Sequence, residues 1–168
     1  LGALKALDSL GRGVPESAVR TGFAETRWSG RLQTVRWRGL PLRLDGAHNP
    51  AAAEQLANER LNWPAQDQGV TWLLAIQAHK QAKAMLRALL QPLDQAWIVP
   101  VPGHCSWDRK ALLELNPNWQ NQLQQSDNAQ SALVEIEAQG RWRDPMPVVA
   151  GSLYLLGDLF RRNLVTAE

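Results

Sequence analysis

The sequence has only one cysteine, Cys105, among its 168 residues. A single cysteine excludes an intrachain disulfide and a cysteine-based metal cluster, and it fits a reducing compartment. No stretch approaches the roughly 18 consecutive apolar residues that a membrane span requires. The first residues lack the basic and then apolar pattern of a signal peptide. These absences predict a cytoplasmic protein with no membrane partner.

The sequence also lacks a strong excess of either basic or acidic residues. The chain carries 18 Lys and Arg against 16 Asp and Glu, a net charge of +2. This balance disfavours a nucleic-acid partner, which would favour a strongly basic surface. The length suits one domain that can bury a real core. Eight tryptophans are many for this length, and because they are scattered along the chain we expect them to serve packing.

A phosphate-binding loop of the form Gly-x-x-x-x-Gly-Lys-Ser/Thr is absent, since the segment Gly11-Arg12-Gly13 has neither the spacing nor the lysine. The sequence therefore offers no glycine-rich phosphate cradle of the kind that nucleotide-driven phosphoryl transfer uses. The spacing of His, Cys, Asp and Glu does not suggest a zinc site either. We therefore expect no catalytic residue and no metal ligand in this chain.

The hydrophobic pattern alternates between short apolar runs and longer segments with helical periodicity. It predicts strands over residues 32–38, 42–45, 71–76, 96–99 and 147–150, and helices over about 2–10, 15–20, 50–61, 82–90, 108–115, 129–139 and 152–160. Ser106 or Asp108 would begin the helix that ends at Leu115. Residues 119–124 are ambiguous, with a short strand as one interpretation. Strands that alternate with helices indicate βαβ units. The predicted fold is α/β and Rossmann-like, with a mostly parallel sheet of about five or six strands flanked by helices and an antiparallel N-terminal hairpin.

The segment from Leu42 to Pro50 reads as a strand, a tight turn and a helix start. Asp45 stands at the carboxyl end of the strand, Asn49 at the N-cap position and Pro50 at the first helical position. His48 precedes the helix. Ligands of open α/β sheets bind at this edge, and a helix N-terminus favours an anionic group.

Three motifs carry a resemblance to a known family. They are Ser29-Gly30-Arg31-Leu32-Gln33, Asp45-Gly46-Ala47-His48-Asn49-Pro50 and Gly151-Ser152-Leu153-Tyr154. Together they resemble the C-terminal domain of folylpolyglutamate synthase/dihydrofolate synthase, of the Mur ligase superfamily. The resemblance covers nearly the whole chain. It implies that residues 1–27 are the helical tail of a preceding ATPase domain and that residues 28–168 are the ligase C-terminal domain.

The resemblance also implies roles for four residues. Arg31 and Asp45 would contact ATP, and His48 and Ser152 would lie on the glutamate side of the closed site. From the residues alone, Arg31 fits a solvated surface, Asp45 a turn, His48 a structural position and Ser152 a helix N-cap. Both kinds of role therefore stay open for each of the four.

Two other segments are weaker candidates. The family commonly has an Asp-Lys-Asp sequence after the strand predicted here at residues 71–76. In this chain His79 and Gln81 flank Lys80, so the lysine lacks its neighbouring carboxylates. The sequence His104-Cys105-Ser106 contains nucleophiles, but adjacent residues rarely converge on one reaction centre.

The implied reaction is amide ligation. ATP would activate the carboxylate of dihydropteroate or a folate as an acyl phosphate, and the amine of L-glutamate would then attack it. The magnesium ligands would lie on the N-terminal domain of the same protein, which would be the partner of this chain. Two alternatives are another Mur-type ligase, for muramyl peptides or cyanophycin, and a non-catalytic Rossmann-like nucleotide-binding module. The Gly46-Ala47 pair and the Gly-Ser-Leu-Tyr motif favour the folate enzyme.

Overall fold

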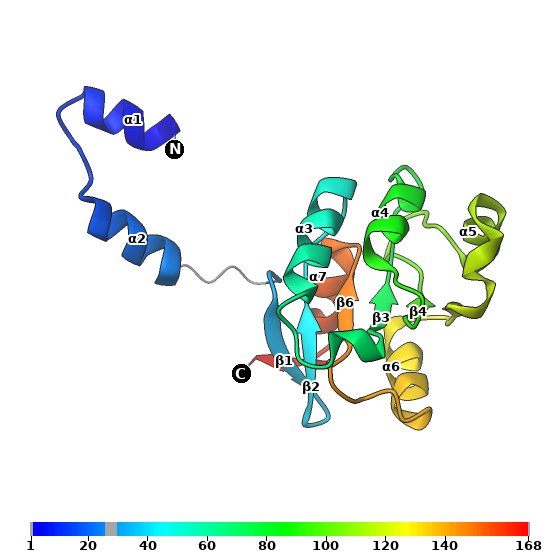
Figure 1. Cartoon of the computed structure of the whole chain (residues 1–168). Coiled ribbons are helices and arrows are strands. Elements are labelled where there is room, and N and C mark those ends of the chain that lie inside the picture. Colours follow the sequence, from blue (N-terminus) through cyan, green and yellow to red (C-terminus); the bar gives the residue numbers. More distant parts are fainter. Residues whose placement is uncertain (1, 26–29, 168) are drawn as a thin grey trace.

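The computed structural model describes residues 2–25 and 30–167 (Figure 1). It consists of two N-terminal helices followed by a sheet with helices on both faces. The helices are α1 (Gly2–Ser9), α2 (Glu16–Glu25), α3 (Pro50–Arg60), α4 (Ala82–Leu89), α5 (Arg109–Leu115), α6 (Ala129–Ala138) and α7 (Leu153–Arg161), with 3-10 turns η1 (Gln66–Gln68) and η2 (Pro117–Asn121). The strands are β1 (Gln33–Trp37), β2 (Leu40–Leu44), β3 (Thr71–Leu74), β4 (Gln95–Ile98), β5 (Leu123–Gln125), β6 (Val148–Ala150) and β7 (Thr166–Ala167).

The sheet confirms the expected fold class. Its seven strands lie in the order β5-β4-β3-β6-β2-β1-β7. The five strands from β5 to β2 are parallel, and β1 is antiparallel to both β2 and β7. The sheet has one strand more than the predicted five or six. β5 overlaps the ambiguous residues 119–124, and β7 was not predicted; the two strands span only three and two residues. Such short segments carry no recognisable alternation of apolar and polar residues.

The buried strands contribute to two separate hydrophobic cores, because successive side chains of a strand point to opposite faces of the sheet. In β3, Trp72 and Leu74 pack under α3, α4 and α5, whereas Leu73 packs against α6 and α7. Both faces of β3 are therefore covered, which explains its uninterrupted apolar sequence.

The tryptophans serve packing, as expected. Trp37, Trp72 and Trp97 are fully buried. Trp142 stacks on Trp37 with 4.9 Å between ring centroids, and its indole N–H donates to the Pro41 carbonyl at 2.7 Å. This contact fastens the segment before β6 to the β1–β2 hairpin. Trp28 lies outside the described residues.

Helices α1 and α2 are separate from the cores. Among residues 2–22, whose side chains the structure describes, neither helix contributes to the two core clusters, and α1 has no buried residue. Figure 1 draws both helices away from the sheet. The expected boundary between residues 27 and 28 falls outside the described residues, so the division into a tail and a ligase domain stays a prediction.

Two local predictions need correction, and the structure decides a third between its two alternatives. Helix α2 continues to Glu25 and is longer than the predicted segment 15–20. Asp108, not Ser106, caps α5, since its carboxylate accepts the Ala111 N–H at 2.8 Å. Leu61 continues the apolar spacing of Leu56 and Ala57, which predicts a buried side chain, but at the C-cap of α3 it is 65% exposed. Arg60 is the buried residue instead.

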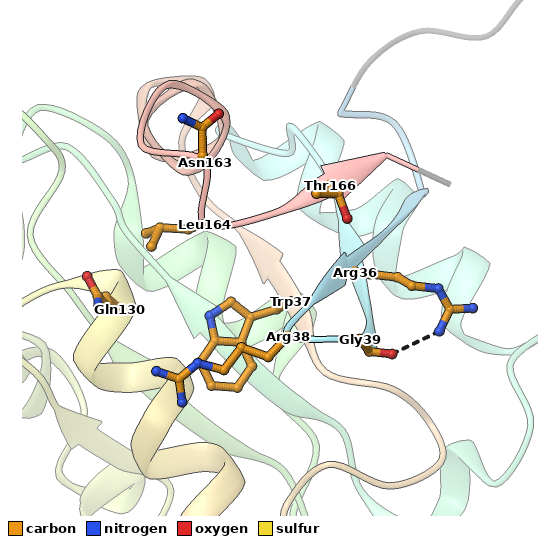
Figure 2. Close-up of a pocket in the computed structure, with 8 residues that line it drawn as sticks. All are labelled: Arg36, Trp37, Arg38, Gly39, Gln130, Asn163, Leu164 and Thr166. Carbon is orange, nitrogen blue, oxygen red and sulfur yellow. Dashed lines mark hydrogen bonds between the residues drawn. The ribbon is translucent and has the colours of Figure 1, made fainter.

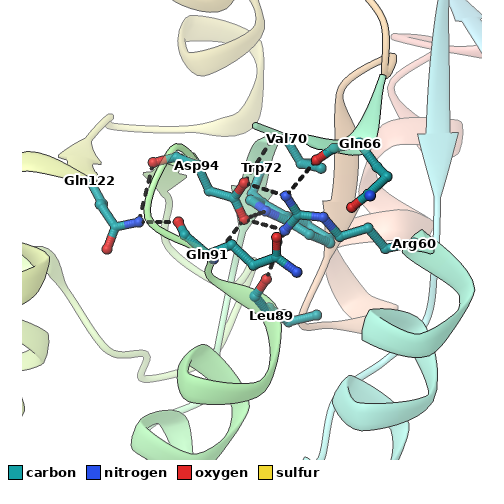
Figure 3. A network of polar contacts seen from close by, with 8 residues as sticks. All are labelled: Arg60, Gln66, Val70, Trp72, Leu89, Gln91, Asp94 and Gln122. Carbon is teal, nitrogen blue, oxygen red and sulfur yellow. Dashed lines mark hydrogen bonds and ion pairs between the residues drawn. The ribbon is translucent and has the colours of Figure 1, made fainter. Parts of the chain in front are cut away.

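A buried ion pair joins α3 to the sheet (Figure 3). Arg60 is 1% exposed and Asp94 is 0% exposed. The Arg60 guanidinium donates through Nη1 to Asp94 Oδ2 at 2.6 Å and through Nη2 to Oδ1 at 2.8 Å. The same carboxylate accepts the backbone N–H groups of Val70 and Gln91 and the indole N–H of Trp72. The pair thereby connects the C-terminal end of α3 with β3 and with the connection from α4 to β4.

We expect Asp94→Asn to lower the free energy of unfolding by about 3–5 kcal/mol, because the buried Arg60 guanidinium would lose its counter-ion. Urea titration followed by circular dichroism measures this change. Asp67→Asn is the matched control, since Asp67 is exposed in η1, and should change stability by less than about 0.5 kcal/mol. Equal effects of the two substitutions would contradict the assignment.

Candidate functional site

The candidate site begins where β2 ends, at the carboxyl edge of the parallel strands. The backbone of Asp45 extends the hydrogen bonding between β2 and β6, since its N–H donates to the Val149 carbonyl at 2.9 Å. Its side chain then fixes two other segments: Oδ1 accepts the Ala47 N–H at 2.8 Å and Oδ2 accepts the Leu32 N–H at 3.0 Å. Asp45 is thus a turn-forming residue, and each carboxylate oxygen keeps capacity for a further hydrogen bond.

Asn49 and Pro50 start α3 as the sequence predicts. The Asn49 side chain accepts the Ala52 N–H at 2.9 Å, and Pro50 occupies the first helical turn. The cap and the proline fix the position of the helix N-terminus directly after His48. Both features stabilise the start of the helix without involving a ligand.

His48 is held by the turn in front of it. Its Nδ1 lies 2.7 Å from the Gly46 carbonyl oxygen. A carbonyl can only accept, so Nδ1 carries the hydrogen, and in the neutral ring Nε2 is the nitrogen that can accept. His48 is half-buried and lines the cavity described below.

The segment that carries Arg31 meets this turn from the other side. The Gly46 N–H donates to the Gly30 carbonyl at 2.5 Å, and the Gln33 side chain accepts the Gly30 N–H at 2.9 Å. These bonds place Arg31 at the same rim as Asp45 and His48. Ser29, the first residue of the motif, lies outside the described residues.

A cavity of about 670 Å³ opens at this rim. Three of the four predicted site residues, Arg31, Asp45 and His48, line it together. Its other walls come from the segment before β1, from the exposed face of α3 and from the start of α7: Gly30, Leu32, Gly46, Ala47, Asn49, Ala52, Gln55, Leu56, Glu59 and Leu153. The volume is that of a typical small-ligand site.

Ser152 does not line this cavity. Its side chain is 2% exposed and its hydroxyl accepts the Leu155 N–H at 3.4 Å, as the N-cap of α7. The neighbouring Leu153 lines the cavity instead. The N-cap role is therefore observed, and the role on the glutamate side stays a prediction.

Gly151 allows β6 to approach β3 and the rim turn closely. Its N–H donates to the Ala47 carbonyl at 2.8 Å, and its φ is +95°. A Cβ at this position would lie 2.5 Å from the Ala75 carbonyl oxygen. Only glycine fits here, because both the positive φ and this contact exclude a side chain.

The weaker candidates lie away from the cavity walls. The Lys80 carbonyl accepts the Trp107 indole N–H at 3.2 Å, and His79 and Gln81 are exposed beside it. The His104 ring packs on Tyr154 at 4.0 Å between centroids.

Neighbouring Cys105 is exposed, while the Ser106 hydroxyl accepts the Val101 N–H. His104 and Ser106 thus have separate partners, which argues against the nucleophile cluster.

Residues of α3 are the part of the site that the sequence analysis missed. Ala52, Gln55, Leu56 and Glu59 line the cavity from one stripe of the helix. The signal was present as the spacing i, i+3, i+4 and i+7. However, Gln55 and Glu59 are ordinary surface residue types that no pattern singles out.

A second hollow of about 320 Å³ lies at the turn of the β1–β2 hairpin (Figure 2). Its arginines already have partners within the protein. Arg36 donates to the Gly39 carbonyl at 2.9 Å, and the Arg38 guanidinium lies 4.7 Å from the centre of the Trp37 ring and 3.7 Å from Glu137. This hollow is therefore not a candidate ligand site.

Another arginine near the site also serves packing. The Arg43 guanidinium of β2 lies 4.5 Å from the centre of the Trp63 ring. Burial lowers the pKa of Arg43 from its usual value, because the interior disfavours the charged form. Arg43 does not line the cavity.

Two negative findings concern the part of the chain that the structure describes. No helix there is long and apolar enough to cross a membrane. Within the same residues, no group of three or more His, Cys, Asp or Glu side chains could hold a metal ion.

Comparison with known proteins identifies the family. The model of the dihydrofolate synthetase C-terminal domain matches residues 30–162. The chain belongs to this family. Dihydrofolate synthetase of Saccharomyces cerevisiae is 27% identical over 164 residues, and folylpolyglutamate synthase of Lacticaseibacillus casei is 30% identical over 137 residues. These matches cover 88% and 82% of this chain.

A solved structure agrees with the assignment. E. coli FolC in complex with DHPP and ADP matches with a TM-score of 0.71 and 25% identity, over 96% of this chain and 37% of that chain. The chain also spans only 38% and 30% of the yeast and Lacticaseibacillus proteins. The chain thus corresponds to a part of these ligases.

We expect Gly151→Ala to lower the free energy of unfolding by about 1–3 kcal/mol, because alanine would be strained at this φ and would collide with the Ala75 carbonyl. Gly157→Ala is the matched control. A Cβ at Gly157, inside α7, meets no atom within 4 Å, so this substitution should raise stability by up to about 1 kcal/mol. Urea unfolding of both variants measures these changes. An unchanged free energy of unfolding in Gly151→Ala would refute the close approach between Gly151 and the Ala75 carbonyl.

Proposed function

We propose that this chain is the C-terminal domain of an ATP-dependent ligase that adds L-glutamate to dihydropteroate or to folates through an acyl phosphate. Residues 28–168 would form the domain and residues 1–27 the tail of a preceding ATPase domain. The main support is the meeting of Arg31, Asp45 and His48 around one cavity at the carboxyl edge of the sheet. Family membership gives the reaction class.

Arg31 and Asp45 suit a nucleotide. The guanidinium offers donors in a fixed fork that matches phosphate oxygens. The Asp45 carboxylate uses one acceptor site on each oxygen for the backbone and can accept ribose hydroxyls with the others. The backbone bonds hold the carboxylate in place before ATP arrives.

His48 and Ser152 would serve the glutamate side in a positioning role. With Nδ1 bound to Gly46, the His48 ring can present Nε2 to the substrate. Ser152 holds the start of α7 by its cap, so we propose that it orients the rim. Neither residue is required to transfer a proton.

The rest of the reaction would come from the preceding domain. A phosphate loop is missing from the sequence, so we propose that the N-terminal domain binds the phosphates and Mg²⁺. This chain would then close over ATP and glutamate. Closure excludes water, which would otherwise hydrolyse the acyl phosphate.

The purified chain should form no amide product from ATP, L-glutamate and dihydropteroate, because half of the site is absent. Titration calorimetry with ATP should show weak or undetectable binding. Product formation by the chain alone would refute the proposal, and tight ATP binding would instead favour a self-sufficient nucleotide-binding module.

The full-length protein tests whether the complete enzyme has the proposed ligase activity. Its upstream sequence should encode a glycine-rich phosphate loop, and the enzyme should ligate glutamate to dihydropteroate but not act on a muramyl peptide. Activity on the muramyl peptide alone would assign the chain to another Mur-type ligase.

A further inference from the structure

The start of α7 exposes two neighbouring apolar side chains beside the cavity. Within residues 30–167, five large apolar side chains are exposed: Leu61, Leu93, Val134, Leu153 and Tyr154. Leu153 and Tyr154, which are 55% and 54% exposed, are the two that are adjacent in sequence, and Leu153 is the one that lines the cavity. Single exposed leucines are ordinary on a protein surface, whereas an apolar pair next to a ligand cavity is a candidate contact surface.

The helix does not need this apolar pair in order to begin. The Ser152 cap already starts α7, and the first turn of the helix contains no acidic residue. Acidic side chains stabilise a solvent-exposed helix start, because they oppose the positive end of the helix dipole. Leu153 and Tyr154 therefore occupy positions where solvent alone would favour polar residues.

Contacts with two other loops hold the pair in place. A Cβ at Gly46 would lie 2.7 Å from Leu153 Cδ2, so Leu153 packs over the rim turn at the point where glycine leaves room for it. The Tyr154 ring packs on His104, in the connection between β4 and α5, with 4.0 Å between the ring centroids. Both side chains thus have a defined position although they are exposed.

Leu153 lies between the two halves of the proposed site. Gly46, over which it packs, stands between Asp45 on the proposed ATP side and His48 on the proposed glutamate side. The acyl phosphate joins a phosphate from ATP to the carboxylate that glutamate attacks, so it would form between these two sides. An apolar side chain at this point displaces water from the reacting carbon.

We propose that Leu153, with Tyr154 beside it, keeps water away from the acyl phosphate when the preceding domain closes on this surface, an inference that rests on the proposed function. E. coli FolC extends well beyond the 37% of its chain that is matched here. The proposed full-length protein accordingly has further residues that cover the pair. Leu153 and Tyr154 act by excluding water and are not catalytic residues.

The two competing reactions of the acyl phosphate differ only in the attacking atom. In the ligation, the amine nitrogen of glutamate bonds to the acyl carbon and the bond from that carbon to the phosphate oxygen breaks. The products are the amide and hydrogen phosphate, which takes up the amine proton. Water that bonds to the same carbon breaks the same bond and gives the free carboxylate, hydrogen phosphate and a proton. ATP is then consumed without amide product.

The experiment uses the full-length protein with ATP, L-glutamate and dihydropteroate, and it measures the phosphate released per amide formed. The unchanged enzyme should release about one phosphate per amide, because closure excludes water. Leu153→Ser should raise this ratio about three- to tenfold, the factor that corresponds to losing the burial of roughly half a leucine side chain. Tyr154→Ser should change the ratio in the same direction.

Two further variants separate water exclusion from a merely structural role. Leu153→Met keeps an apolar side chain of similar volume and should keep the ratio of the unchanged enzyme. Leu61→Ser is the matched control, since Leu61 is 65% exposed at the end of α3 and does not line the cavity. It should also leave the ratio unchanged, and circular dichroism checks that each variant is folded.

The outcomes distinguish this inference from the proposed function. Amide formation with the same ratio in Leu153→Ser, Tyr154→Ser and the unchanged enzyme would overturn the inference and leave the proposed function standing. An equal rise of the ratio in Leu61→Ser would also overturn it, because the effect would not depend on the site. A full-length protein that forms no amide from dihydropteroate would overturn the proposed function, and this inference with it.

Discussion

The buried pair between Arg60 and Asp94 is the contact on which the arrangement of this domain depends. Two charges taken out of water need close mutual geometry and further hydrogen bonds to offset their lost hydration. Asp94 meets this condition, since its carboxylate accepts bonds from one side chain of α3, one indole and two backbone N–H groups. The geometry is therefore specific, and α3 cannot slide along the sheet without breaking it.

Helix α3 connects this ion pair to the cavity at the rim. Its N-terminus follows the rim turn, its exposed stripe lines the cavity, and its last residue is Arg60. The cavity wall is thus fixed at both ends, by the Asn49 cap at the rim and by the ion pair in the core.

The rim itself joins three segments that lie far apart in sequence. Gly30 and Leu32 bond to the turn at residues 45–47, and Gly151 bonds to the same turn from β6. The two glycine contacts join backbone groups, whereas the Leu32 N–H donates to the Asp45 carboxylate. Gly151 is needed because the backbones approach closely there. Asp45 participates in the scaffold and is also the proposed ribose ligand, so its turn role and its ligand role are compatible.

Much of this could be predicted from the sequence because the signals were local. The Asn49-Pro50 helix start and the apolar run of β3 are both contained within a few residues. The fold class and the shared rim of Arg31, Asp45 and His48 followed from such signals together with the family resemblance.

The features that were missed depend on distant partners or on very short segments. Nothing near Arg60 indicates its burial, since Asp94 lies 34 residues away. Strands β5 and β7 are too short to show a period. Gln55 and Glu59 become notable only when the fold places Leu32 and Asp45 opposite them.

Strand β7 affects whether the edge of β1 is open to pairing with another molecule. It pairs with β1 only at Val35 and Arg36, yet it covers the outer side of a strand whose free N–H and C=O groups would otherwise template the addition of another chain. Residues 166 and 167 thereby shorten the exposed edge of β1, although neither lines the cavity.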